Sequence, residues 1–211
     1  MLRFDKLEKS YGNRPVLQGC SGRFGTGAFA LQGPNGIGKS TLLAALAGAV
    51  PIDGGEVCIN ETCLHANPIA ARQLLAYAPD ESPVYRFMRG REFLEFVARA
   101  RGKAPDTLDD DIAECFGINT HMHTRFGAMS LGTQKKFLLA AAWIGAPRVL
   151  LLDEPANGLD AAAREYLATL LQRQSEQSTV LFSTHDHAFI AAAGATPIQM
   201  ETLQAKSSPV A

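Results

Sequence analysis

Long apolar segments are missing from the sequence. Its longest apolar stretches are FLLAAAWIGA and LLAALAGAVPI, well short of the about 18–20 residues that span a bilayer. The opening MLRFDKLEKS alternates charged and apolar side chains, which is not the pattern of a signal peptide. We therefore expect a chain that does not cross a membrane by itself.

An excess of charge of one sign is missing as well. The 211 residues carry 20 Lys and Arg against 21 Asp and Glu, which gives a net charge of −1. A protein that binds nucleic acid through bulk electrostatics needs a basic surplus, so no nucleic-acid partner is expected. Apolar residues make up 46% of the chain, an ordinary share for one α/β domain of this length.

Cysteine is scarce, and no two cysteines have CxxC spacing. The four are Cys20, Cys58, Cys63 and Cys115. In a chain without a secretory signal, cysteines are usually reduced and lie in the core or on the surface. We therefore expect free thiols rather than disulfides or a zinc site.

Candidate strands and helices alternate at both ends of the chain, and helices are grouped in its middle. Strands are predicted at 2–11, 15–24, 27–31, 55–60, 73–78, 148–153, 178–184 and 196–200, and helices at 41–49, 90–102, 106–118, from 130 onward, 161–173 and 187–193. The alternation predicts an α/β core with a helical insertion.

Helical spacing also predicts which faces are buried. It places Phe93, Phe96, Val97 and Ala100 on one face of the helix at 90–102, and Leu167, Leu170 and Leu171 on the inner face of the helix at 161–173.

The stretch GPNGIGKST matches the phosphate-binding pattern G-x4-G-K-[ST], between a predicted strand and a predicted helix. Its glycines allow the backbone to turn several N–H groups toward one anion, and the helix dipole adds to this attraction. Lys39 can reach the β- and γ-phosphates, Ser40 can bind Mg²⁺, and Thr41 offers another hydroxyl. The predicted phosphate-binding residues are Gly33, Pro34, Asn35, Gly36, Ile37, Gly38, Lys39, Ser40 and Thr41.

Two further strands end in residues that suit the same chemistry. RVLLLDEP ends in two carboxylates, of which Asp153 is the candidate Mg²⁺ ligand. Glu154 points elsewhere and can orient or activate an attacking water. His185 follows the buried strand LFST, from which it could donate a hydrogen bond to a γ-phosphate.

A second polar helix start occurs at SLGTQKK, with Ser130 as the expected N-cap. A helix start of this kind can bind an anion through its backbone N–H groups, although the chain already has one phosphate-binding loop. Lys135 and Lys136 are expected to be the solvated rim of this helix.

The order GPNGIGKST, SLGTQ, RVLLLDEPANGLD and STHD resembles the nucleotide-binding subunit of ATP-binding cassette (ABC) transporters, over nearly the whole chain. The resemblance implies an α/β fold: a P-loop NTPase core with a parallel sheet, an N-terminal antiparallel β lobe and an inserted helical lobe at about 83–145. It implies one ATPase domain over 1–205, a short tail at 206–211, and ATP and Mg²⁺ as cofactors.

The family reading also implies roles for single residues. Tyr11 matches the aromatic that stacks on adenine, Glu154 the catalytic carboxylate and His185 the switch histidine. In the family, two such subunits bind two ATP molecules between them. Each ATP lies on one subunit and under the helix of the other subunit that corresponds to the helix starting at Ser130 here, which carries the family's signature motif. The residues expected to act in trans at this interface are Ser130, Gly132 and Asp160.

The implied partners are a second ABC subunit, most simply another copy of this chain, and a separate membrane permease. The chain is then expected to be cytoplasmic and peripheral on the membrane. The stretch PDESPVYRFMRGREFLEFVARARG resembles drug and antibiotic export ATPases, which favours export, and permease contact is expected around 83–91.

The sequence departs from the family pattern at two places. Asp80 stands where the family usually has a Gln that senses Mg²⁺; it is a candidate metal ligand, with a solvated loop acid as the alternative. In the signature, Leu131 and Thr133 replace the usual Gly and Gln, while Ser130 and Gly132 are kept.

Two other functions fit parts of the sequence. A P-loop nucleotide kinase would need a substrate lid, which the middle arginines could supply, but it has no use for SLGTQ, NGLD or His185. These arginines are Arg86, Arg89, Arg91, Arg99 and Arg101. A soluble ABC-type clamp without a transport role would carry a coiled-coil insertion or a second cassette, and neither is seen.

Overall fold

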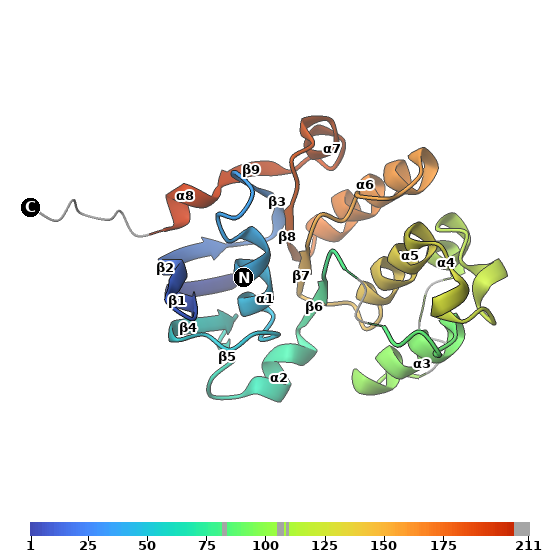
Figure 1. Cartoon of the computed structure of the whole chain (residues 1–211), viewed down its shortest axis with the longest axis horizontal. Helices are drawn as coiled ribbons and strands as arrows, with labels where there is room; N and C mark the ends of the chain where they lie inside the picture. Colours follow the sequence, from blue (N-terminus) through green and yellow to red (C-terminus); the bar gives the residue numbers. More distant parts are fainter. Residues whose placement is uncertain (82–83, 105–107, 109, 205–211) are drawn as a thin grey trace, which may run out of the picture.

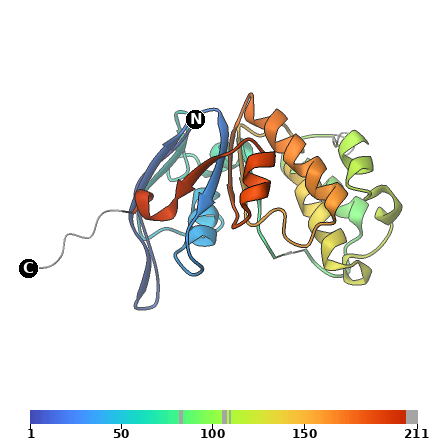
Figure 2. The same ribbon diagram turned by 90° about the horizontal axis from the view of Figure 1, so that it is seen from above.

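Two β-sheets organise the computed structural model, which describes residues 1–81, 84–104, 108 and 110–204. The N-terminal sheet is antiparallel, with strand order β2-β1-β4-β5, and the second is parallel, with order β6-β7-β8-β3-β9. The antiparallel sheet lies at one side of the molecule, and helices α3, α4 and α5 lie together at the other (Figures 1 and 2). This arrangement confirms the predicted fold class.

The first sheet consists of β1 (Leu2–Tyr11), β2 (Arg14–Phe24), β4 (Gly54–Ile59) and β5 (Thr62–Cys63). The second consists of β3 (Gly27–Gln32), β6 (Leu75–Ala78), β7 (Val149–Leu152), β8 (Thr179–Ser183) and β9 (Thr196–Gln199). The helices are α1 (Lys39–Leu46), α2 (Pro68–Gln73), α3 (Gly90–Ala100), α4 (Asp110–Cys115), α5 (Leu131–Ala142), α6 (Ala161–Ser175), α7 (His187–Ala192) and α8 (Met200–Leu203). In the described part of the chain, none of the helices is long and apolar enough to cross a membrane.

The parallel sheet separates two apolar cores. Because successive side chains of a strand point to opposite faces, Leu151 of β7 packs in the core with α1 and the antiparallel sheet. Leu150 and Leu152 pack in the other core, with α5 and α6. All four residues of β7 are fully buried, as the predicted buried parallel strand requires.

The carboxyl ends of four parallel strands meet at one edge of this sheet. The loop to α1 follows β3, Asp80 follows β6, Asp153 follows β7, and His185 follows β8. Ligands of open α/β sheets bind at this edge. The topology therefore brings segments far apart in the sequence to one place.

Helical spacing predicted the buried face of α6 correctly and that of α3 only in part. Leu167, Leu170 and Leu171 are buried, as predicted. In α3, Phe93 is buried together with Leu94 and Ala98, whereas Phe96 is 60% exposed and Ala100 is also exposed. The prediction for Phe96 and Ala100 is wrong because α3 packs against α5 with the face around Phe93 and Ala98.

Cys58 and Cys63 are joined by a disulfide, so the expectation of four free thiols is wrong. Strand β5 and helix α2 were not predicted, and β5 is the reason for the bond. The β4–β5 hairpin places Cys58 directly opposite Cys63. Their Cα atoms lie 3.9 Å apart across the ladder, which the spacing of five residues did not reveal.

From the disulfide we predict how many thiols react without reductant and how much reduction lowers the free energy of unfolding. Without reductant, the denatured chain should react with a thiol reagent at Cys20 and Cys115 only, and at all four cysteines after reduction. Because the bond closes a short loop, reduction should lower the free energy of unfolding by about 2 kcal/mol, measured by urea denaturation. In the control Cys115→Ser, reduction should have the same effect. Four reactive thiols without reductant would contradict the bond.

Candidate functional site

A cavity of about 1060 Å³ opens at the carboxyl edge of the parallel sheet. Most of the predicted nucleotide-site residues line it. These are Tyr11, Asn35, Gly36, Gly38, Lys39, Ser40, Thr41, Asp80, Glu154 and His185. Residues from five separate stretches thus surround one space large enough for a small-molecule ligand.

The phosphate-binding loop has the backbone that its glycines predict. Gly33, Gly36 and Gly38 have φ angles of 143°, 79° and 111°, in the region that favours glycine. A Cβ on Gly38 would lie 3.0 Å from Val16 Cγ1, so the close approach of β2 also requires a glycine there. Helix α1 begins after Gly38 without a side-chain cap, which leaves its first N–H groups for a ligand.

Lys39 is folded back over this loop. Its side chain is buried, and its Nζ donates to the carbonyl oxygens of Gly33 at 2.7 Å and of Pro34 at 3.3 Å. The same Nζ lies 3.1 Å from Nε2 of His185. Gly33 and Pro34 therefore hold the lysine rather than line the cavity, and Ile37 packs against the core beneath.

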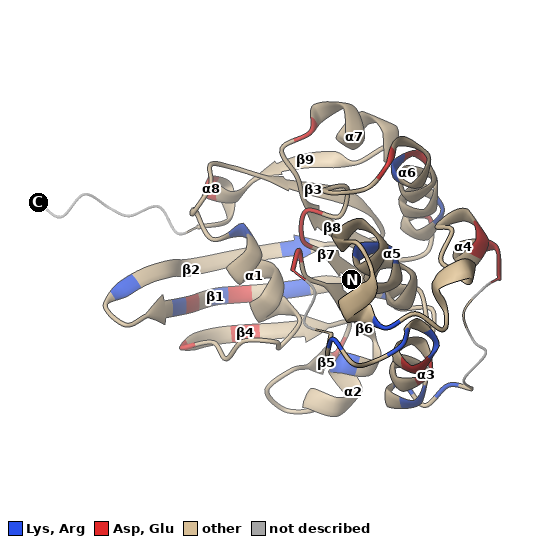
Figure 3. Ribbon diagram, turned by 45° about the vertical axis from the view of Figure 1, so that its right-hand side comes forward, with Lys and Arg blue, Asp and Glu red and all other residues tan. Residues whose placement is uncertain are grey.

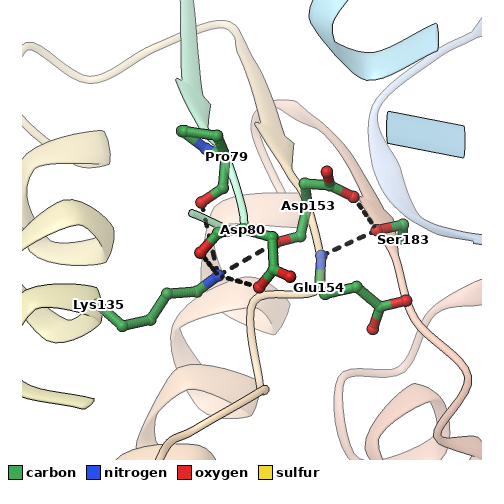
Figure 4. A network of polar contacts seen from close by, with 6 residues as sticks. All are labelled: Pro79, Asp80, Lys135, Asp153, Glu154 and Ser183. Atoms are coloured by element: carbon green, nitrogen blue, oxygen red, sulfur yellow. Dashed lines mark hydrogen bonds and ion pairs between the residues drawn. The ribbon is translucent and has the colours of Figure 1, made fainter. Parts of the chain in front are cut away.

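Asp153 and Glu154 are fixed by a serine of the neighbouring strand. The Ser183 hydroxyl donates to Asp153 Oδ1 at 2.6 Å and accepts from the Glu154 backbone N–H at 2.8 Å (Figure 4). Ser183 is fully buried, and Asp153 is 5% exposed. One hydroxyl thus sets the orientation of both carboxylate residues.

Glu154 has an unusual backbone and a shifted pKa. Its φ of 42° lies in the left-handed region, which places its side chain apart from that of Asp153. Burial raises the pKa of its carboxyl, and the charges of His185 and Lys39 act in the opposite direction. Glu154 Oε1 lies 3.5 Å from Nε2 of His185. A carboxylate so placed can accept a proton from a water in the cavity.

The donors at this site fit Mg²⁺. Ser40 offers a hydroxyl and Asp153 a carboxylate, and Mg²⁺ prefers oxygen ligands of this kind. The hydrogen bond from Ser183 orients the Asp153 carboxylate, as the hydrogen-bond partners of metal-binding carboxylates do. Ser40 and Asp153 are therefore the residues that could hold the ion.

Tyr11 lies at the end of β1 and is 51% exposed on the wall of the cavity. Nζ of Lys9 lies 5.4 Å from the centroid of its ring. An aromatic ring half open to a cavity can stack on a planar ligand, so Tyr11 as the adenine contact stays a prediction.

The second helix start does not line this cavity. Ser130 caps α5, accepting from Thr133 N at 3.1 Å, and Gly132 packs so closely on the loop before α6 that a Cβ would lie 2.7 Å from Gly158 O. Asp160 caps α6 and pairs with Lys136, Oδ2 to Nζ, at 2.5 Å. The role of Ser130, Gly132 and Asp160 across a dimer interface stays a prediction.

The solvated rim expected for Lys135 and Lys136 is wrong. Lys136 is ion-paired to Asp160, and Lys135 is only 5% exposed, with its Nζ 3.0 Å from Asp80 Oδ1. The expectation failed because the loops that follow β6 and β7 cover this face of α5. Asp80, a predicted Mg²⁺ ligand or loop acid, has Lys135 as its ion-pair partner, and its role as a metal ligand stays a prediction.

Sequence reasoning missed several residues of the site. Arg14 and Val16, from the start of β2, line the cavity beside the phosphate-binding loop. Ser183 could have been found: β7 and β8 run in parallel with Leu152 opposite Phe182, so Ser183 is placed beside Asp153. A serine ending a buried strand two residues before His185 is the signal.

Replacing Ser183 by Ala should lower the ATPase rate about 10- to 100-fold, because both carboxylate residues lose their orienting partner. A phosphate-release assay measures this. Ser178→Ala is the matched control: its hydroxyl is also buried, precedes the same strand and donates to Pro147 O at 2.9 Å. Both variants should lose stability, but only Ser183→Ala should lose activity. Equal rates in the two variants would contradict the orienting role.

Comparisons with known proteins agree with this geometry. Residues 19–157 match the family model described as ABC transporter. The ABC transporter ATP-binding protein YxlF of Bacillus subtilis is 33% identical over 190 residues, which cover 88% of this chain and 62% of that protein. The linearmycin resistance ATP-binding protein LnrL, also of Bacillus subtilis, is 27% identical and covered to 61%. The chain thus spans about three fifths of the length of these relatives.

Solved structures show the same fold. An ATP-binding subunit of an ABC transporter superposes with a TM-score of 0.82 at 26% identity, covering 90% of this chain and 81% of that one. A putative ABC transporter ATP-binding protein from Pyrococcus furiosus gives a TM-score of 0.77 at 22% identity, covering 97% and 99%. The family match extends over most of the chain and includes the phosphate-binding loop, the signature segment and both acidic residues at the end of β7. The chain belongs to the ABC transporter family.

Proposed function

We propose that this chain is the ATP-binding and ATP-hydrolysing subunit of a transporter, and that it drives transport through a separate permease. The observation that carries the proposal is the single cavity at the carboxyl edge of the sheet. There Lys39 and Ser40 of the phosphate-binding loop face Glu154 and His185, with Asp153 directly behind. Two of the relatives that match are named as an ABC transporter ATP-binding protein and a transport ATP-binding protein.

In the proposed mechanism, the backbone N–H groups at the start of α1 and Nζ of Lys39 bind the phosphates, and Tyr11 stacks on adenine. Ser40 and Asp153 would hold Mg²⁺, which supplies positive charge to the β- and γ-phosphates. Glu154 accepts a proton from the attacking water, and His185 holds that water and the carboxylate in line. In the structure, Nζ of Lys39 lies 3.1 Å from Nε2 of His185. The lysine must therefore move away from His185 to bind the phosphates.

We propose further that the active form is a dimer of this chain, in which each ATP lies on one P-loop and under the partner's Ser130 and Gly132. Asp160 belongs to the loop that crosses to the partner. Closure of the two subunits assembles each site, and hydrolysis reopens it. The dimer sits on the cytoplasmic face of the membrane, bound to the permease.

A stacked aromatic pair supports the proposed permease contact. In the predicted contact segment, Tyr85 and Phe87 are 68% and 69% exposed, with ring centroids 5.5 Å apart. Pro83, at its start, lies outside the described residues. Large exposed aromatic side chains are typical of protein interfaces. The likeness to LnrL, named for linearmycin resistance, supports export as the direction.

The primary test is release of free phosphate from Mg-ATP by the purified chain, with Lys39→Ala as the inactive control. Transfer of phosphate to a nucleotide acceptor would instead indicate a kinase. Against that alternative, none of the five middle arginines is among the residues that line the cavity, as far as the chain is described. Arg101, for example, donates to Ile144 O at 2.6 Å inside the helical lobe.

The permease contact predicts a second, separate result. Tyr85→Ser with Phe87→Ser should release the chain from membranes that contain its natural partner, while phosphate release by the purified chain stays within about twofold of wild type. Ile69→Ser, another exposed apolar side chain, is the control. If the wild-type chain does not sediment with these membranes and does not co-purify with a membrane protein in detergent, the result would favour a soluble ABC-type clamp without a transport role.

Charge gives no support for a nucleic-acid partner. In Figure 3, basic and acidic positions are interspersed along β1 and over α3 and α6. Arg3 pairs with Glu56, and Lys9 with Asp53, across neighbouring strands and loops. Such pairing neutralises the surface that a phosphate backbone would need.

A further inference from the structure

A buried ammonium group joins the helical lobe to the nucleotide site. Nζ of Lys135, from α5, donates to Asp80 Oδ1 at 3.0 Å, to Asp80 O at 3.1 Å and to Asp153 O at 3.2 Å, with Pro79 O at 3.5 Å (Figure 4). Its side chain is only 6% exposed. Three of the four acceptors are neutral carbonyls, and the Asp80 carboxylate is the one that carries charge.

Asp80 stands between two cavities. It lines the nucleotide cavity together with Lys39, Ser40 and Glu154. It also lines a second cavity of about 470 Å³ on the α5 side, together with Lys135. Its side chain is 47% exposed, and within the described part of the chain its ion pair with Lys135 holds the carboxylate on the α5 side.

The charge of Asp80 matters because the proposed ligand is a polyanion. A free carboxylate on the wall of the cavity would repel the phosphates, whereas a carboxylate paired with an ammonium is neutral as a unit. Asp80 is among the residues that line the nucleotide cavity and Lys135 is not, so it is the carboxylate that faces the ligand.

We propose that Lys135 is a positioning residue that acts through Asp80: it draws the Asp80 carboxylate away from the phosphates and neutralises it. Asp80 is then the partner of a lysine from the helical lobe and not a ligand of Mg²⁺. The proposal rests on the proposed nucleotide-binding function of this site.

The test is a double-mutant cycle in nucleotide affinity, with Lys135→Gln, Asp80→Asn and both together. Gln can still donate to the carbonyls, so the change removes charge and keeps hydrogen bonding. Affinity is measured with an ATP analogue carrying an N-methylanthraniloyl group, in EDTA and in Mg²⁺, with unlabelled ATP as competitor. Lys136→Gln is the matched control, since Lys136 is the next residue of α5 and is also ion-paired to an aspartate.

In EDTA, Lys135→Gln should weaken binding about tenfold in the wild-type background and less than about twofold in the Asp80→Asn background. Lys136→Gln should bind like wild type. Equal effects of Lys135→Gln in both backgrounds, or none in either, would overturn the proposal. If the wild-type chain itself binds no nucleotide, the proposed function fails instead, so the two failures are distinguishable.

If Lys135→Gln does not fold, Asp80→Asn alone still tests whether Asp80 is a ligand of Mg²⁺. Its affinity should equal or exceed that of wild type both in EDTA and in Mg²⁺, because the change removes a negative charge from the cavity wall and leaves the Lys135 ammonium in place. A loss of more than about tenfold that occurs only with Mg²⁺ would assign Asp80 to the metal and overturn the proposal. In that case Lys135→Gln should tighten binding in Mg²⁺, which is opposite to our expectation.

Discussion

Glu154→Gln should lower steady-state ATP hydrolysis about a thousandfold while leaving ATP binding intact. The amide has nearly the same shape but cannot take a proton from the attacking water. The backbone N–H of Glu154, which donates to Ser183, is unchanged by the substitution. Phosphate release measures the loss, and equilibrium binding of labelled ATP shows that the site remains.

The same variant should accumulate as an ATP-bound dimer, because closure no longer ends in hydrolysis. Size-exclusion chromatography with and without ATP would show this shift. Glu176→Gln, an exposed carboxylate beyond the end of α6, is the control and should behave like wild type. Normal hydrolysis by Glu154→Gln would remove Glu154 from the catalytic role.

Ser130→Arg should also abolish hydrolysis, although Ser130 does not line its own chain's nucleotide cavity. If Ser130 serves the partner's ATP, an Arg there disables only the site that it faces, which is both sites when both chains carry the change, and leaves nucleotide binding by the single chain unchanged. Ser130→Ala controls for the lost helix cap, which costs about 1 kcal/mol in both variants. Thermal unfolding compares the two.

Mixing the two inactive variants gives the sharper result. In a dimer of one Ser130→Arg chain and one Glu154→Gln chain, one site combines an intact Glu154 with an intact Ser130. Random pairing makes half of the dimers mixed, so an equal mixture should recover about a quarter of the wild-type rate. Combining both changes in one chain and mixing it with either single variant should recover nothing. No recovery in the first mixture would contradict the proposed action of Ser130 in trans.

Sequence reasoning worked best where the chemistry is contiguous in the chain. The phosphate-binding loop could be predicted as a unit because its glycines, Lys39 and Ser40 are neighbours. Buried parallel strands such as β7 could be predicted because they are apolar throughout. The topology of the sheet then placed Asp153, Glu154 and His185 at one edge.

The contacts that could not be predicted depend on how the elements pair and pack in space. Lys135 looks like a solvated residue in its own helix, and only the packing of α5 on the ends of β6 and β7 shows that it is buried. The Cys58–Cys63 bond depends on a two-residue strand, β5, that has no clear sequence signal. The exposure of Phe96 depends on which side of α3 contacts α5.

Helix α5 has a mechanical consequence. Its twelve residues form a rigid rod about 18 Å long. Ser130 caps its first turn, Lys135 fastens it to the nucleotide site one turn later, and Trp143, the only tryptophan of the chain, ends it. A shift at Ser130 on contact with a partner must move Lys135 and Trp143 with it. The fluorescence of the Trp143 indole should therefore report the movement of the helical lobe without an added label.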